Sequence, residues 1–175
     1  GQVIAPGSGP ARELAAEGFA GVQIDGPHGG IRNVAGTDEQ FLMFNVTNPP
    51  AMLDNVRQSA AELALLPDLL QDLTLDTSAC EGASPRTTFD TGTLGLMGHS
   101  MGATIAPLTF AADERYGALL LSGAGGSWTW NIVHKEKPLD VRPLAEAMLG
   151  YPDHGAALTG HDPAVNLLQF LGEAA

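Results

Sequence analysis

The sequence predicts an α/β fold built as one domain from residues 1–175, and three observations support this. Hydrophobic residues make up 44% of the chain, which is enough for a buried core. Nearly continuous apolar runs at residues 19–24, 93–97 and 116–121 are typical of strands buried on both faces. Segments with helical spacing separate these runs, which favours parallel pairing. We therefore expect a mostly parallel sheet with helices on both faces.

Turn-forming residues mark the elements of the first part. The short apolar run at residues 3–5 ends in a cluster of Pro, Gly and Ser. Residues 11–17 have helical spacing, with Gly18 placed to end that helix. The next apolar run, residues 19–24, stops at an Asp-Gly-Pro turn, as a strand does before a break.

A long helix is expected after Asn48, which can cap it, with Pro49 in its first turn. Apolar residues then recur every three or four positions, namely Met52, Val56, Ala60, Leu63 and Leu66. Pro67 is expected to kink or interrupt the helix, because proline lacks an amide hydrogen and its ring crowds the preceding turn. Residues 74–92 are predicted to be a surface connection.

The rest of the chain, residues 127–175, is predicted to be helical or irregular. Its best helices are at residues 139–149 and 163–171. Asp162 is placed to cap the second of these, with Pro163 at its first position.

The charge balance excludes several classes of partner. The formal net charge is -12, with eight Lys+Arg against 20 Asp+Glu. A nucleic-acid binder needs a basic patch, and an anionic membrane surface would repel this chain. No apolar run reaches the roughly 18 residues of a membrane span. A neutral or cationic small molecule is the expected partner. Cys80 is the single cysteine, so no disulfide or cysteine-based zinc site forms within the sequence.

A Gly-x-Ser-x-Gly pattern, Gly98 to Gly102, stands between the apolar run at residues 93–97 and a helical segment at residues 105–112. A strand that turns sharply into a helix strains its apex residue and projects that side chain beyond the sheet. Side chains at positions 98 and 102 are expected to collide with neighbouring segments, so both require glycine. The context favours a nucleophilic Ser100 over a serine that merely caps a helix.

With these residues the sequence resembles the α/β-hydrolase superfamily, in particular its bacterial esterase and lipase-like members. The turn at Gly98 to Gly102 matches the nucleophile elbow of that family, with His99 beside the nucleophile. A family loop of the form D-x-P-x-H-G-x-R is matched at Asp25, Pro27, Gly30 and Arg32, whereas Gly29 stands at the histidine position and His28 one residue early. A helix motif of the same subgroup resembles Asp54-Asn55-x-Arg57-Gln58-Ser59.

The resemblance implies hydrolysis of a carboxylic ester through an acyl-enzyme, with no metal or organic cofactor. Ser100 would attack the ester, and the Met101 amide would donate to the oxyanion. His99 is expected to pack rather than to react. Trp128 and Trp130 are interpreted as lid or core residues.

By the same resemblance, the catalytic acid and histidine follow the nucleophile in later strand–loop units. Residues 127–175 have none, which predicts that they form a cap before missing strands. The chain is therefore expected to be the middle of a domain and inactive when made alone. The first oxyanion loop is expected before Gly1, although Gly7-Ser8-Gly9 is an alternative.

Three alternatives stay open. A complete triad would use Asp140 or Asp153 together with His154 or His161. Acyl transfer or amide hydrolysis would use the same nucleophile. A non-catalytic α/β module would keep the turn and bind a partner.

Overall fold

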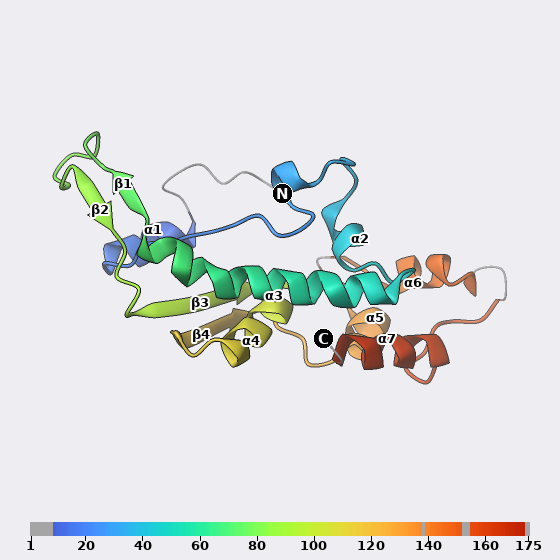
Figure 1. Cartoon of the computed structure of the whole chain (residues 1–175). Helices are drawn as coiled ribbons and strands as arrows, with labels where there is room; N and C mark the ends of the chain where they lie inside the picture. The colour runs from blue at the N-terminus through green and yellow to red at the C-terminus, as the bar shows by residue number, and fades with distance from the viewer. Residues whose placement is uncertain (1–8, 138, 152–154, 174–175) are drawn as a thin grey trace.

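A computed structural model describes residues 9–137, 139–151 and 155–173 of the chain (Figure 1). The described elements in chain order are α1 (Pro10–Ala16), the 3-10 turn η1 (Gly30–Arg32), α2 (Glu39–Met43), α3 (Pro49–Gln71), β1 (Thr74–Asp76), β2 (Arg86–Thr88), β3 (Leu94–His99), α4 (Met101–Ala112), β4 (Tyr116–Ser122), α5 (Trp128–His134), α6 (Arg142–Met148) and α7 (Pro163–Glu173). Helix α3 runs along the molecule, with β3, β4 and α4 beside one half and α5 to α7 near its other end (Figure 1). The mixed α/β class predicted from the sequence is confirmed.

Strands β3 and β4 form a parallel pair joined by α4. Their register pairs Leu96 with Leu119 and His99 with Ser122, so both strands end at the same edge. In β3 the buried Leu96 and Gly98 alternate with exposed residues, whereas in β4 only the first residue, Tyr116, is buried. The parallel pairing expected for these two runs is confirmed.

The core beside this pair lies between α3, α4 and the strands. One buried cluster joins Met43 and Val56 to Ile105, and another joins Leu96 to Ala106 and Tyr116. Two hydrogen bonds to carbonyl groups of α3 fix the layers: the Thr109 hydroxyl donates to Ala60 (3.1 Å) and the Tyr116 hydroxyl donates to Leu63 (2.6 Å). These contacts attach α4 and β4 to α3.

Helices α5, α6 and α7 have a separate core. Its buried members are Ile132, Val133, Ala145, Leu158, Val165 and Leu168. Asp162 accepts a hydrogen bond from the Ala164 amide (3.0 Å), which confirms it at the start of α7. Glu146 accepts from the Leu158 amide (2.8 Å) and from Arg142 (2.9 Å), and these bonds lower the pKa of Glu146. The predicted helical character of residues 127–175 holds for the part that the structure describes.

The strand predicted at residues 19–24 is wrong. These residues form no helix or strand, and Phe19 is 50% exposed. They lie beside α1, where the Cα of Gly21 is close to Ala11. A strand needs a hydrogen-bonding neighbour, and residues 19–24 pair with no other strand among the described residues. The run at residues 3–5 and the turn at Gly7 and Ser8 lie outside the described residues.

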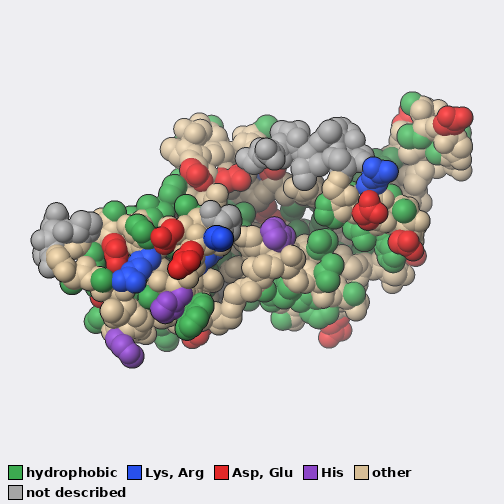
Figure 2. Space-filling model, turned by 180° about the vertical axis from the view of Figure 1, so that it is seen from behind, with side chains coloured by type: hydrophobic (Ala, Val, Ile, Leu, Met, Phe, Trp, Pro, Cys, Tyr) green, Lys and Arg blue, Asp and Glu red, His purple; other side chains and the backbone are tan. Residues whose placement is uncertain are grey.

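Helices on both faces of the sheet were also expected, and this is wrong as well. Helix α4 packs against β3 and β4 from one side, with α3 behind it. Met97 and Leu120 are neighbours across the strand pair, and their exposed fractions are 46% and 60%. Figure 2 shows hydrophobic side chains gathered over this half of the molecule. The second face of the pair is therefore uncovered within the described part of the chain.

Two local predictions need correction. Pro67 does not interrupt α3, which continues to Gln71 with Pro67 buried inside it. Packing of the same apolar face on both sides of the proline holds the helix despite the missing donor. The surface connection at residues 74–92 contains an antiparallel hairpin, β1 and β2, which projects from the molecule (Figure 1). The predicted cap is confirmed, because the Asn48 side chain accepts from the Ala51 amide.

The loop that contains Asp25 and Arg32 is fixed to α3. Arg32 donates to both carboxylate oxygens of Glu62 (2.6 and 2.8 Å) and also to the Asp25 carbonyl (3.1 Å). His28 shares a hydrogen bond with Asn55 (3.1 Å). The two segments that carry the family resemblance in this part of the chain therefore contact each other.

Glu62→Gln is expected to lower the thermal unfolding midpoint near neutral pH. The hydrogen bond from Arg32 holds the pKa of Glu62 below its ordinary value. The stabilisation is therefore present above the ordinary pKa and is lost as the pH falls through the lower, folded-state pKa. Circular dichroism should show a difference between wild type and variant that shrinks as the pH falls below about 4.5, the ordinary glutamate pKa, toward the lower folded-state pKa. Glu81→Gln, in the exposed loop between β1 and β2, is the control and should show no such trend.

Candidate active site

Ser100 lies at the turn between β3 and α4 and has an unusual backbone conformation. Its φ is 53° and its ψ is -112°, and it is the sole non-glycine residue with positive φ among the described residues. The Ser100 amide donates to the Ser122 carbonyl (2.9 Å), and its own carbonyl accepts from the Ala103 amide (2.9 Å). The strand ladder and the first helical turn thus hold this residue from both sides. A strained position of this kind costs on the order of 1–3 kcal/mol.

Gly98 is required by close backbone approach. A Cβ at this position would overlap the Gly102 carbonyl oxygen and would lie 2.6 Å from the Gly102 carbonyl carbon and 2.9 Å from the Ala103 amide nitrogen. The end of β3 therefore touches the first turn of α4, as the sequence predicted for this glycine. The same prediction for Gly102 is wrong, because a Cβ there would meet no atom within 4 Å. Because position 102 faces open space at the start of α4, a small side chain fits there.

His99 does not have the packing role that the sequence suggested. Its side chain is exposed, and its Nδ1 shares a hydrogen bond with the Ser122 hydroxyl (3.1 Å) across the strand pair. Strand alternation places it on the opposite side from Gly98, and β4 provides the partner. His99 is thus held by Ser122 and not by Ser100.

The surroundings of the Ser100 hydroxyl are open. Within the described residues, no histidine or carboxylate donates to it or accepts from it. Asp140 is exposed before α6, and His161 lies at the start of α7. Asp153 and His154 lie outside the described residues. The structure therefore brings none of the described candidate triad residues into contact with Ser100.

The amide of Met101 occupies the first position of α4. The first amides of a helix have no partner inside the helix, and the helix dipole favours negative charge near them. The Ala103 amide is already bonded to the Ser100 carbonyl. An oxygen held next to Ser100 would meet the Met101 amide first. The role of the Met101 amide as oxyanion donor stays a prediction.

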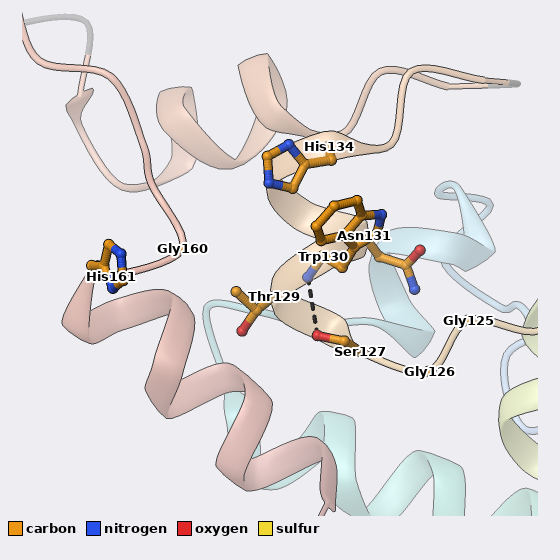
Figure 3. A pocket seen from close by; sticks show the side chains of 9 residues that line it. All are labelled: Gly125, Gly126, Ser127, Thr129, Trp130, Asn131, His134, Gly160 and His161. Atoms are coloured by element: carbon orange, nitrogen blue, oxygen red, sulfur yellow. Dashed lines mark hydrogen bonds between the residues drawn. The ribbon is translucent and has the colours of Figure 1, made fainter.

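A cleft of about 470 Å³ opens next to this edge of the sheet. Its lining comes from the loop after β4, from α5 and from the start of α7, and consists of Gly125, Gly126, Ser127, Thr129, Trp130, Asn131, His134, Gly160 and His161. Figure 3 shows Trp130 and His134 together on α5, with His161 across the opening. Carboxyl ends of parallel strands are where α/β proteins bind ligands.

The tryptophans next to this cleft have different environments. Trp128 is half-buried and packs edge-on against Phe44, with ring centroids 5.3 Å apart, in keeping with its interpretation as a core residue. Trp130 is 67% exposed, and the centroid of its ring lies 4.4 Å from the centroid of the His134 ring. His134 is exposed. Sequence reasoning missed that Gly160 and His161 join these residues, because tertiary packing brings these distant positions together.

Comparisons with models of protein families, with curated proteins and with solved structures found no match to this chain. Among the described helices, none has the length and apolar character needed to cross a membrane.

Proposed function

We propose that the protein is a serine hydrolase that cleaves carboxylic esters through an acyl-enzyme on Ser100. The observation that carries the proposal is the left-handed backbone of Ser100 at the end of a parallel strand. Backbone strain in a non-glycine residue is concentrated at functional sites, because neighbouring structure has to enforce it. The Gly-x-Ser-x-Gly pattern and the conformation of Ser100 are independent arguments for the same residue.

The reaction would proceed in two halves. The Ser100 Oγ attacks the carbonyl carbon of the ester while its proton passes to a general base. The bond to the alcohol oxygen then breaks, and the alcohol leaves with that proton. Water next attacks the acyl group on Ser100, which releases a carboxylic acid and restores the hydroxyl. This scheme requires no metal ion and no organic cofactor.

The residues around Ser100 would have separate roles. The Met101 amide would donate to the oxyanion, and its place at the start of α4 supports this role. The general base and its acid would come from residues outside the described part of the chain. The net charge of -12 favours a neutral or cationic ester. Acyl transfer and amide hydrolysis would share the first half-reaction and differ in the acceptor or in the bond cleaved.

A second function, a non-catalytic α/β module, has one observation in its favour. Within the described residues the Ser100 hydroxyl contacts no base. Such a module would keep the tight turn as part of its packing and would bind a partner without reacting.

A fluorophosphonate probe separates the two functions. It should be applied to the complete product of the gene that encodes this sequence, and the adduct mapped by mass spectrometry. A hydrolase is expected to give one adduct on the peptide that contains Ser100, since only an activated serine reacts. Heat-denatured protein, in which the turn is lost, should give none. The absence of an adduct on the folded protein would favour the module.

A further inference from the structure

The cleft beside the loop that follows β4 is open to solvent, and its volume is that of a small-molecule site. Its volume of about 470 Å³ lies within the usual range of roughly 300–1,000 Å³ for ligand pockets. Three of its lining residues are glycines, namely Gly125, Gly126 and Gly160. The glycines leave the backbone open, and the largest side chain among the described lining residues is Trp130, with His134 beside it. The cleft therefore presents one indole ring to an incoming molecule.

Trp130 is exposed although tryptophan is highly buried on average. Its exposed fraction is 67%, and its ring partner among the described residues is His134, tilted by 41°. Trp128, two positions earlier, packs against Phe44. Trp128 therefore has an aromatic partner within the fold, whereas most of the Trp130 side chain is open to solvent.

The polar groups of the cleft set the charge of its ligand. Among its described lining residues there is no Asp, Glu, Lys or Arg. Ser127 is occupied, because its hydroxyl accepts from the Trp130 amide (3.1 Å) and donates to Gln169 (3.1 Å). The other polar side chains of the described lining are those of Thr129, Asn131, His134 and His161. The indole face of Trp130 suits an aromatic ring, and no carboxylate among the described lining residues is available to pair with an ammonium group.

The loop after β4 connects the cleft to Ser100. The Cα of Gly123 faces the His99 ring and the Ser100 amide, since a Cβ there would lie 3.5 Å and 3.7 Å from them. Gly125, two residues later, lines the cleft. Two residues span at most about 7 Å, so the near wall of the cleft lies close to the Ser100 turn. Gly125 is thus the lining residue that connects the cleft to the Ser100 turn.

We infer that the cleft binds an uncharged aromatic ring against Trp130, and, resting on the proposed function, that this ring belongs to the ester that Ser100 cleaves. The substrate class is thus an aryl ester, or an ester with an aryl group a short distance from the carbonyl. His134 supports the Trp130 ring, and the glycines allow the ligand to approach the backbone.

The binding test uses the Ser100→Ala variant, in which an ester is not consumed. Saturation-transfer NMR with phenyl acetate should show contact with the ring protons, and cyclohexyl acetate should bind about three- to tenfold more weakly. Adding Trp130→Leu should weaken phenyl acetate binding by a similar factor. The matched control is Phe170→Leu, because Phe170 is 66% exposed on α7 and does not line the cleft. Equal binding of both esters, or no effect of Trp130→Leu, would overturn the inference.

The kinetic test separates this inference from the proposed function. With Ser100 intact, Trp130→Leu should lower kcat/KM for phenyl acetate about three- to tenfold more than it lowers kcat/KM for ethyl acetate. Ser100-dependent hydrolysis of both esters with no effect of Trp130→Leu would overturn the inference alone. Binding of the ring that depends on Trp130, without any Ser100-dependent hydrolysis, would overturn the proposed function and leave the aromatic site standing.

Discussion

Replacing Ser100 with alanine is expected to reduce the hydrolysis of a p-nitrophenyl ester by at least about three orders of magnitude. The left-handed turn presents this one hydroxyl beyond the end of β3, and alanine removes the only atom that forms the acyl bond. The binding surface and the Met101 amide would remain, so a small residual rate is expected. Initial rates of the complete gene product, wild type and variant, give the measurement.

The matched control is Ser122→Ala. Ser122 is the other hydroxyl at this edge of the sheet, and its Oγ is bonded to His99 and not to the reacting group. Removing it is expected to keep activity within tenfold of the wild type. If Ser100→Ala stayed within that range, or if Ser122→Ala caused the larger loss, Ser100 would not be the nucleophile.

Gly98→Ala is expected to destabilise the protein by about 3 kcal/mol, because the added methyl group overlaps the backbone at the start of α4. Backbone atoms cannot move aside as a flexible side chain does, so the strand and helix would have to separate. Urea unfolding followed by circular dichroism gives the free energy of unfolding. Hydrolysis of the ester should fall together with stability, since the same contact holds Ser100.

Gly102→Ala tests the same chemical change four residues later. A methyl group there meets open space in the first turn of a helix. Alanine is favoured over glycine in helices, so the expected result is a gain of about 0.5–1 kcal/mol. If both variants lost the same free energy of unfolding, the turn would not depend on the contact between Gly98 and Gly102.

Local signals explain the features that sequence reasoning predicted correctly. Asn48 before two prolines and Asp162 before Pro163 mark helix starts that the structure confirms. Such caps depend on hydrogen bonds within a few residues of the chain. The strands that follow Thr93 and Arg115 were likewise recognisable, because each is a continuous apolar run long enough to pair with the other.

Predictions that depended on a distant partner were less successful. Residues 19–24 are as apolar as β3, yet they form no strand because no neighbouring strand accepts their hydrogen bonds within the described chain. The expected collision at Gly102 required a neighbouring segment that is not there. In both cases the local pattern is typical of the predicted feature, but the neighbouring segment that the feature requires is absent from the described part of the chain.

The sequence by itself determined the α/β class, the starts of α3 and α7 and the position of Ser100 between a strand and a helix, since each rests on residues next to one another in the chain. Only the tertiary structure decided which side of the strand pair is covered, that Arg32 pairs with Glu62, and that Trp130 and His161 share a cleft. Those features arise where segments far apart in sequence pack together. Packing depends on the shape and polarity of both surfaces at once, and a pattern in one segment describes only one of them.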